Sequence, residues 1–158
     1  MDNNFSTNLT EIDRNILRLM QKDMSLSVAE IAQRAGLSQS ACWRRISRME
    51  QGGIIRAKVA LLNADKLDLG VVVFANVRLS SHSDQTLREF EQEISACREV
   101  MECYTMTGSM DFLLRIVTKD IHSYEQFFRN HLSNMAAVQE VHSSVAITQI
   151  KYTTELPL

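Results

Sequence analysis

Three arginines, Arg44, Arg45 and Arg48, lie close together in the segment SQSACWRRISRME, which begins at Ser38. Guanidinium groups are permanently charged, and their planar forks match both phosphate oxygens and the O6/N7 edge of guanine. The same segment carries the aromatic residue Trp43. This composition predicts an anionic partner, although the net charge of the whole chain is only −2.

The charge is distributed unevenly along the chain. Residues 11–62 contain nine Arg and Lys against five Asp and Glu, whereas residues 63–158 contain eight basic and thirteen acidic residues. A basic first third joined to an acidic remainder indicates two domains with different partners. The basic part is the candidate for binding a polyanion.

Short helices are predicted to position these arginines. Thr10, with Asp13 three residues later, caps a helix over residues 11–22. A capping box that starts at Ser27 opens a second helix, which ends at Gly36. The apolar face of the first helix is formed by Ile12, Ile16, Leu17 and Met20.

The third helix is predicted over residues 39–51, with Ser38 as its N-cap. Cys42, Ile46 and Met49 repeat at helical spacing and form its buried stripe, so the arginines lie mostly on the other side. Two short helices joined by a glycine-containing turn form a helix-turn-helix, whose second helix fits the major groove of DNA. A solvated basic face on an ordinary helix is the alternative.

Residues 54–62, IIRAKVALL, are predicted to form a strand or short wing after the third helix. Phosphate contact is expected for Arg56 and Lys58, and plain exposed strand positions are the alternative. The residues predicted to bind DNA are Ser27, Ser38, Gln39, Ser40, Arg44, Arg45, Arg48 and Lys58.

The rest of the chain alternates between strand-like and helical periods in the order β-α-β-β-α-β, which is the ferredoxin-like pattern. Strands are predicted over residues 71–79, 100–107, 111–118 and 138–150, and helices over residues 84–96 and around Tyr124–Leu132. The predicted fold class is therefore α+β, a winged helix-turn-helix followed by a ferredoxin-like ligand-binding and dimerisation domain. The predicted domains are residues 1–62 and 71–158, joined by a connector at 63–70.

One face of such a sheet is covered by its two helices, and the other is bare unless something packs on it. Apolar residues fall on both faces of the predicted strands, as shown by the pairs Val72/Phe74, Leu113/Ile116 and Val145/Ile147. A bare apolar face is a liability in a monomer, so we expect dimerisation through this domain. A two-fold axis would also pair the helix-turn-helix units.

The turn between the two middle strands, TMTGSMD, combines hydroxyls, a glycine and a carboxylate. Asp111 can accept an ammonium group, and the backbone N–H groups around Gly108 can bind a carboxylate, which would suit a free amino acid. The residues alone favour a plain hairpin. The candidate effector site comprises Thr105, Met106, Thr107, Gly108, Ser109 and Asp111.

Other classes of protein are disfavoured. An odd number of cysteines without a C-x-x-C pair argues against a disulfide framework or a structural zinc site. The four histidines are scattered, and no nucleophile elbow, P-loop or dinucleotide fingerprint is present, so we expect neither an enzyme nor a cofactor. No apolar run is long enough for a membrane span, and the polar N-terminus is no targeting peptide, so a cytoplasmic location is expected.

Taken together, these segments resemble the Lrp/AsnC family of bacterial transcription regulators. The resemblance is carried by Leu37–Ser40, Arg45–Glu50, Gly53–Ile55, Gly108–Leu113 and Gln149–Leu158. It implies DNA binding by the N-terminal domain, and homodimers that assemble into octamers or hexadecamers through the C-terminal domain. It also implies an amino-acid effector that binds between dimers at the G-x-x-D turn, with Ser144 contributed by a neighbouring subunit. Arg45 matches the family's most regular recognition-helix arginine.

The effector is left open among leucine, methionine and cysteine, with the apolar Met106 and Met110 favouring leucine or methionine. Arg56-Ala-Lys58 stands where the family often has Gly-Tyr, which leaves the wing contacts undefined. Two other binding proteins are alternatives: an architectural DNA-binding protein of the nucleoid with little sequence preference, and an amino-acid-binding module with a degenerate DNA domain. The intact arginines argue against the second.

Overall fold

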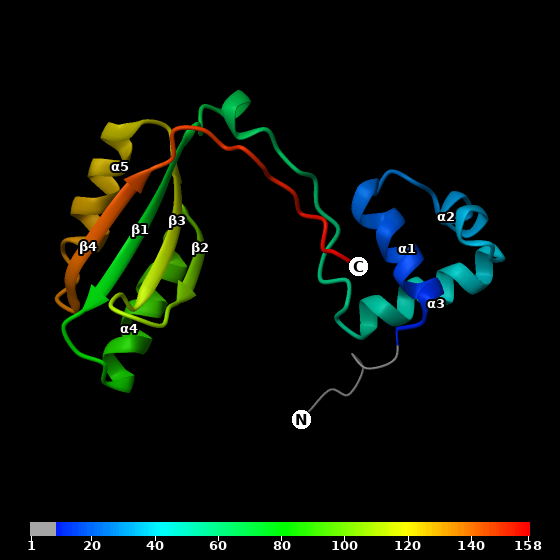
Figure 1. Ribbon diagram of the computed structural model, residues 1–158, viewed down its shortest axis with the longest axis horizontal. Helices are drawn as coiled ribbons and strands as arrows, with labels where there is room; N and C mark the ends of the chain where they lie inside the picture. The colour runs from blue at the N-terminus through cyan, green and yellow to red at the C-terminus, as the bar shows by residue number, and fades with distance from the viewer. Residues whose placement is uncertain (1–8) are drawn as a thin grey trace. The chain divides into compact units, whose positions relative to one another are not determined.

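The computed structural model describes residues 9–158, so the first eight residues of the predicted N-terminal domain lie outside the described part. The described residues form two compact units (Figure 1). The first comprises the described residues up to Leu61 together with Lys151–Leu158, and the second comprises Leu62–Ile150. The predicted second domain extended to residue 158, whereas the structure groups the last eight residues with the helical unit.

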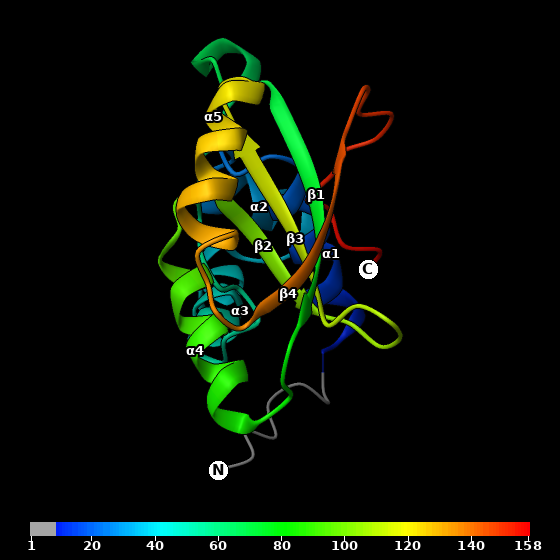
Figure 2. The same cartoon turned by 90° about the vertical axis from the view of Figure 1, so that its left-hand side faces the viewer.

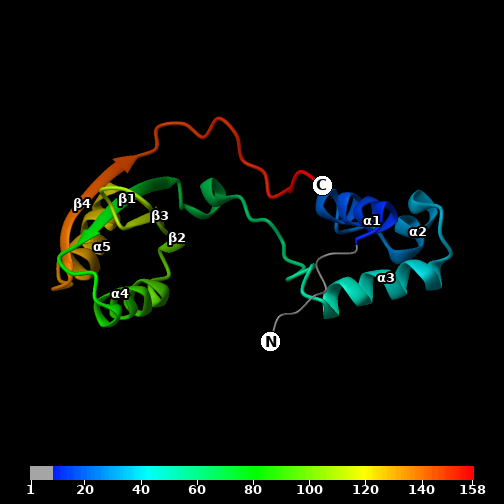
Figure 3. The same ribbon diagram turned by 60° about the horizontal axis from the view of Figure 1, so that its bottom comes forward.

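The first unit contains α1 (Glu11–Lys22), α2 (Val28–Ala35) and α3 (Gln39–Gln51), with the predicted bounds (Figure 3). Capping boxes begin α1 and α2, and Gly36 ends α2 in the left-handed conformation that glycine adopts without strain. The core of this unit comprises Ile16, Leu17, Met20, Ile31, Ala32, Cys42, Ile46 and Met49. Ile12, predicted on the apolar face, is exposed, and Asp13 is buried there instead.

The C-terminal tail completes the first unit by packing on α1. The side-chain amide of Gln21 donates to the carbonyl oxygen of Leu156 (2.9 Å) and accepts from its N–H group (3.0 Å). Arg18 Nε donates to the carbonyl oxygen of Leu158 (3.0 Å), and the Leu158 side chain packs against the helical core. The tail thus has hydrogen-bond partners on α1 although it forms no strand.

The strand predicted over residues 54–62 does not form in the described chain. Ile54 and Ile55 donate to the carbonyl oxygen of Met49 and close the end of α3, and residues 56–62 make no backbone–backbone hydrogen bond with the rest of the described chain. A strand needs a neighbour for its backbone N–H and C=O groups, and no described segment provides one. Val59, Leu61 and Leu62 are therefore exposed.

The second unit is a four-stranded antiparallel sheet in the order β2-β3-β1-β4, with both helices on one face (Figure 2). Its elements are a 3-10 turn (Ala64–Leu67), β1 (Val71–Leu79), α4 (Asp84–Ala96), β2 (Val100–Thr105), β3 (Phe112–Thr118), α5 (Ile121–Phe127), a wider helical turn (Phe128–Leu132) and β4 (Val138–Val145). The predicted order is confirmed, but β2, β3 and β4 are shorter than predicted. β4 ends at Val145, opposite Val73, and among the described strands it pairs with β1 alone, which continues only two residues further, to Val71.

The sheet face opposite the helices is less apolar than predicted. It carries the exposed apolar side chains of Phe74 and Tyr104, but also charged pairs. Arg78 pairs with Glu140, and Arg115 Nε donates to Glu102 Oε1 at 2.9 Å. Among the described residues, no helix has the length and apolar character needed to cross a membrane.

Candidate nucleic-acid interface and effector loop

The N-terminal end of α3 combines three of the predicted DNA-binding residues. Ser38 caps the helix by accepting a hydrogen bond from Ala41 N–H (3.3 Å), and its hydroxyl lies 3.3 Å from that of Ser40. Gln39 and Ser40 occupy the first turn, whose N–H groups have no partner within the helix. No acidic residue lies in this turn, so the positive end of the helix dipole stays open to an anion.

Two of the three arginines of α3 are bound to one buried carboxylate. Arg45 Nη1 lies 2.8 Å from Asp13 Oδ1, and Arg48 Nη2 lies 2.9 Å from Asp13 Oδ2. The Asp13 side chain is fully buried, whereas those of Arg45 and Arg48 are 29% and 54% exposed. These contacts fix α3 against α1, and they leave part of each guanidinium group facing solvent.

Asp13 is ionised in this setting. Burial is the largest single influence and raises its pKa, but hydrogen bonds from Thr10 and Arg45, with the charge of Arg45, outweigh it and lower the pKa overall. The Thr10 hydroxyl donates to Asp13 Oδ2 at 2.7 Å, and the Thr10 N–H group donates to the same oxygen at 3.0 Å. The carboxylate therefore caps α1 and anchors α3 at once.

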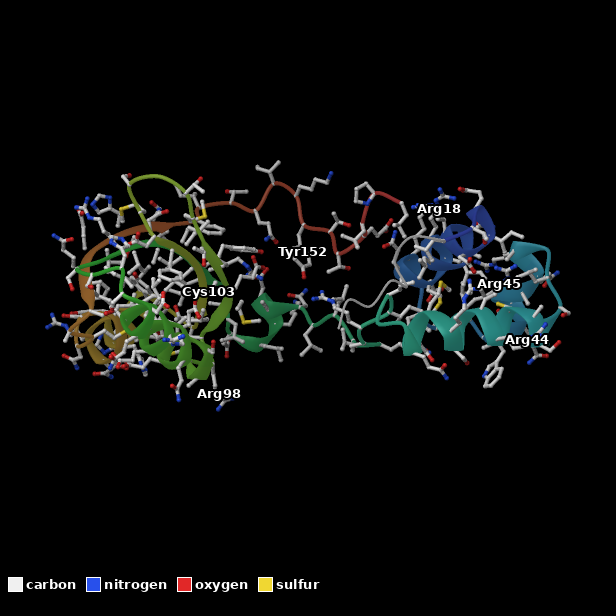
Figure 4. All side chains as sticks on the ribbon, turned by 90° about the horizontal axis from the view of Figure 1, so that it is seen from below. Arg18, Arg44, Arg45, Arg98, Cys103 and Tyr152 are labelled. Atoms are coloured by element: carbon white, nitrogen blue, oxygen red, sulfur yellow. The ribbon has the colours of Figure 1, made fainter. Side chains whose placement is uncertain are left out.

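Arg44 differs from its two neighbours. It is exposed and has no ion pair within the described residues. It borders a hollow of about 300 Å³ that is also lined by Leu37, Ala41, Arg45 and Arg48. Figure 4 shows Arg45 between α3 and α1, and Arg44 on the outer side of α3. Arg44 is therefore the arginine of this helix whose donors are not used by any of the residues that the structure describes.

The other two predicted DNA-binding residues have internal partners. The Ser27 hydroxyl and N–H groups both lie within 2.8 Å of Glu30 Oε2, and these bonds lower the pKa of Glu30. The ionised Glu30 beside Ser27 repels phosphate, so α2 has the opposite electrostatic character from α3 at its start. Lys58 Nζ lies 2.5 Å from Glu50 Oε1.

The G-x-x-D loop is held by a compact set of bonds. Thr105 ends β2, and after it the N–H group of Met106 donates to the carbonyl oxygen of Asp111 (2.8 Å). Gly108 has a φ of 119°, which disfavours any residue with a Cβ atom. Met106, Thr107, Gly108 and Ser109 are exposed, so the loop is accessible to a ligand.

Asp111 connects this loop to the end of β1. Its Oδ2 accepts the Leu79 N–H group (2.7 Å), and its Oδ1 lies 2.8 Å from His82 Nε2. The bond from Leu79 is the main reason why the pKa of Asp111 is lowered, with smaller contributions from His82. The carboxylate is thus fixed and negatively charged at the base of the loop.

Ser144 is not brought to this loop within one chain. It lies opposite Phe74 in the β1–β4 register, while Asp111 bonds to Val77 and Leu79 near the other end of β1. Ser144 can therefore belong to the same site only through a neighbouring subunit.

Sequence reasoning missed two residues at these sites. Asp13 has a recognisable signal, because it shares the helical spacing of the buried Ile16, Leu17 and Met20, and a carboxylate on a buried stripe requires a cationic partner. His82 has no comparable signal, since it lies in the connection after β1 and meets Asp111 only in the fold.

Comparison with known proteins agrees with this architecture. Residues 72–156 match the model of the Lrp/AsnC ligand-binding domain, and residues 9–56 match that of the winged helix-turn-helix DNA-binding domain. The chain belongs to the Lrp/AsnC family. Members of this family are DNA-binding transcription regulators and not enzymes, so the resemblance seen in the sequence is confirmed.

The Lrp/AsnC relatives match over nearly their full length. The DNA-binding transcriptional activator DecR of Escherichia coli K12 is 35% identical, over 95% of this chain and 99% of its own. The crystal structure of an AsnC family regulator from Agrobacterium tumefaciens is 44% identical, with a TM-score of 0.90, over 94% of this chain and 97% of that chain. A Neisseria meningitidis regulator in complex with L-methionine is 31% identical, with a TM-score of 0.90, over 95% of this chain and 97% of that chain.

Proposed function

We propose that this Lrp/AsnC protein binds specific operator sequences and controls genes of amino-acid metabolism in response to a free amino acid, with leucine or methionine favoured. The observation that carries the proposal is the fixed, ionised Asp111 beneath the exposed Gly108 loop, in a chain that also has a helix-turn-helix. A role at the chromosome implies a cytoplasmic location.

The chemistry of the loop suits an amino acid. The Asp111 carboxylate provides a negative charge for the ammonium group, and the loop N–H groups and the hydroxyls of Thr105, Thr107 and Ser109 provide donors for the carboxylate. Met106 provides an apolar surface for the side chain. The relative from Neisseria meningitidis, solved with L-methionine, supports an effector of this class. The Leucine-responsive regulatory protein of Klebsiella pneumoniae, 31% identical, supports leucine as the other candidate.

On DNA, two copies are expected to dock α3 in successive major grooves, as a two-fold dimer requires. The second copy covers the sheet face that carries Phe74 and Tyr104, and such dimers assemble into octamers. Assembly also brings Ser144 of a neighbouring subunit to the loop. The effector acts by binding one assembly state better than another, since a ligand with equal affinity for both shifts nothing.

The test is a gel-shift titration of the full-length protein on DNA upstream of its own gene and the neighbouring genes. Random duplex is the competitor, and each of the common amino acids is added in turn. A shift that resists the competitor and changes with one or two amino acids is the expected result. A shift that random DNA removes, and that no amino acid alters, would contradict the proposal and favour an architectural DNA-binding protein.

Asp111→Asn tests the effector site itself. The amide oxygen still accepts the Leu79 N–H group, but the negative charge is lost, so we expect DNA binding without an effector response. Asp120→Asn is the matched control, because Asp120 also accepts a backbone N–H group (Ser123, 2.7 Å) and lies at the start of α5, outside the loop. A normal effector response in Asp111→Asn would place the effector elsewhere.

A further inference from the structure

Trp43 is the single tryptophan of the chain and lies in the second turn of α3. Its side chain is 59% exposed, although tryptophan is a highly buried residue on average. Scattered apolar residues on a surface are common, so exposure by itself identifies no partner. Its surroundings are more informative.

Trp43 borders a hollow of about 590 Å³ together with Gln39 and Ser40 of α3 and Val28 of α2. Gln39 and Ser40 lie four and three residues before Trp43, so all three share one face of the helix at its N-terminal end. The hollow is therefore lined by an amide, a hydroxyl and an indole ring from α3 and by a valine from α2. Such a surface fits a flat ligand that has both polar edges and a methyl group.

The orientation of α3 leaves this face to an outside partner. Arg45 binds Asp13 of α1, and Trp43 lies two residues earlier, about 200° away around the helix. Cys42, Ile46 and Met49 lie between Arg45 and Trp43 around the helix and pack into the core. The exposed Arg44 lies next to Trp43, and the first turn has no acidic residue, so the surroundings favour a polyanion.

We propose that Trp43 and Gln39 together read an A·T base pair in the major groove. The Gln39 side chain has the donor and acceptor that adenine N7 and N6–H₂ require, and the apolar Trp43 ring contacts the C5-methyl group of thymine. Arg44 then binds an adjacent phosphate or guanine. This inference rests on the sequence-specific DNA binding proposed above, and it makes Trp43 a specificity-determining residue.

The test uses DNA duplexes selected from a random pool by the full-length protein. Each thymine is replaced in turn by deoxyuridine, which pairs identically but lacks the methyl group. At one position in each half-site, the wild-type protein should bind about fourfold more weakly, which corresponds to one buried methyl group at about 0.8 kcal/mol. The Trp43→Ala variant should bind the selected duplex roughly tenfold more weakly and show no difference between the two bases at that position.

Two controls separate base reading from folding and from general DNA affinity. Trp43→Phe keeps an apolar ring and should keep most of the methyl sensitivity, while thermal unfolding of Trp43→Ala should match the wild type because the residue is exposed. The intrinsic fluorescence of Trp43, the single tryptophan, should become protected from acrylamide by the selected duplex and much less by random duplex.

Several outcomes would overturn the inference. If the wild-type protein binds every deoxyuridine duplex as tightly as the thymine duplex, Trp43 makes no contact with a thymine methyl group. If Trp43→Ala lowers the affinity for selected and random DNA equally, Trp43 contacts the DNA backbone and not a base. Acrylamide protection that depends on protein concentration without DNA would assign Trp43 to a contact between copies of the chain. A failure to select any sequence would instead contradict the specific binding proposed above.

Discussion

Arg45 of α3 and Asp13 of α1 form the contact that orients the candidate recognition helix, with 2.8 Å between Nη1 and Oδ1. Asp13 is fully buried, and its second oxygen accepts from Arg48 at 2.9 Å. Arg45 and Arg48, which the sequence predicts to bind DNA, therefore also pair with a buried carboxylate inside the helical unit. A change at Asp13 should affect both stability and DNA binding.

Replacing Asp13 by alanine should lower the free energy of unfolding of the helical unit by roughly 2–4 kcal/mol, because the variant loses both ion pairs and the capping box of α1. DNA affinity should fall as well, since α3 loses its anchor. The measurement is thermal unfolding together with gel-shift titration. Glu11→Ala is the control, because Glu11 is exposed and its ion pair within the described residues is a surface contact with Arg18. If Asp13→Ala costs as little stability as Glu11→Ala, Asp13 has no anchoring role.

The Asp13 contribution should also depend on pH. Its folded-state pKa lies below the ordinary value of 3.8, so the stabilisation is complete above that pH and is lost as the pH falls through the lowered folded value. The difference in the free energy of unfolding between the wild type and Asp13→Asn should therefore be constant near neutral pH and shrink in acid below 3.8. A difference that grows with acidification would mean that folding raises the pKa of Asp13 instead of lowering it.

Arg44 and Arg45 should behave differently when each is replaced by alanine. Arg44→Ala should weaken DNA binding by about 1–3 kcal/mol if it contacts a base, with unchanged thermal unfolding, because it has no partner within the described residues. Arg45→Ala should lower both affinity and stability. Arg88→Ala removes an equal charge from the exposed surface of α4 and should change neither. If the Arg44→Ala variant unfolds at a lower temperature than the Arg88→Ala variant, Arg44 has a structural role.

The C-terminal tail should stabilise the helical unit. Gln21→Ala removes two hydrogen bonds to Leu156, and Leu158→Ala removes an apolar contact, so each should lower the free energy of unfolding by about 1–2 kcal/mol. Differential scanning calorimetry of the full-length variants would resolve the transition. Gln33→Ala, at an exposed position of α2, is the matched control. Unfolding identical to this control would show that the tail contributes no stability.

The sequence by itself determined the local elements. The bounds of α1, α2, α3, α4 and β1 agree with prediction, because caps and hydrophobic periodicity act over a few neighbouring residues. The order β-α-β-β-α-β follows from the same signals. The strand predicted at 54–62 failed because a strand also requires a partner, which no local pattern specifies.

Only the tertiary structure decided how the candidate side chains are used. Thirty-two residues separate Asp13 from Arg45, and twenty-nine separate His82 from Asp111, so neither pair is visible in a local pattern. Ion pairs form where folding brings a buried carboxylate to a cation, because an unpaired buried charge is too costly to retain. For the same reason, the sequence identifies the arginines of α3, while the fold separates those that anchor the helix from Arg44, whose donors remain available to DNA.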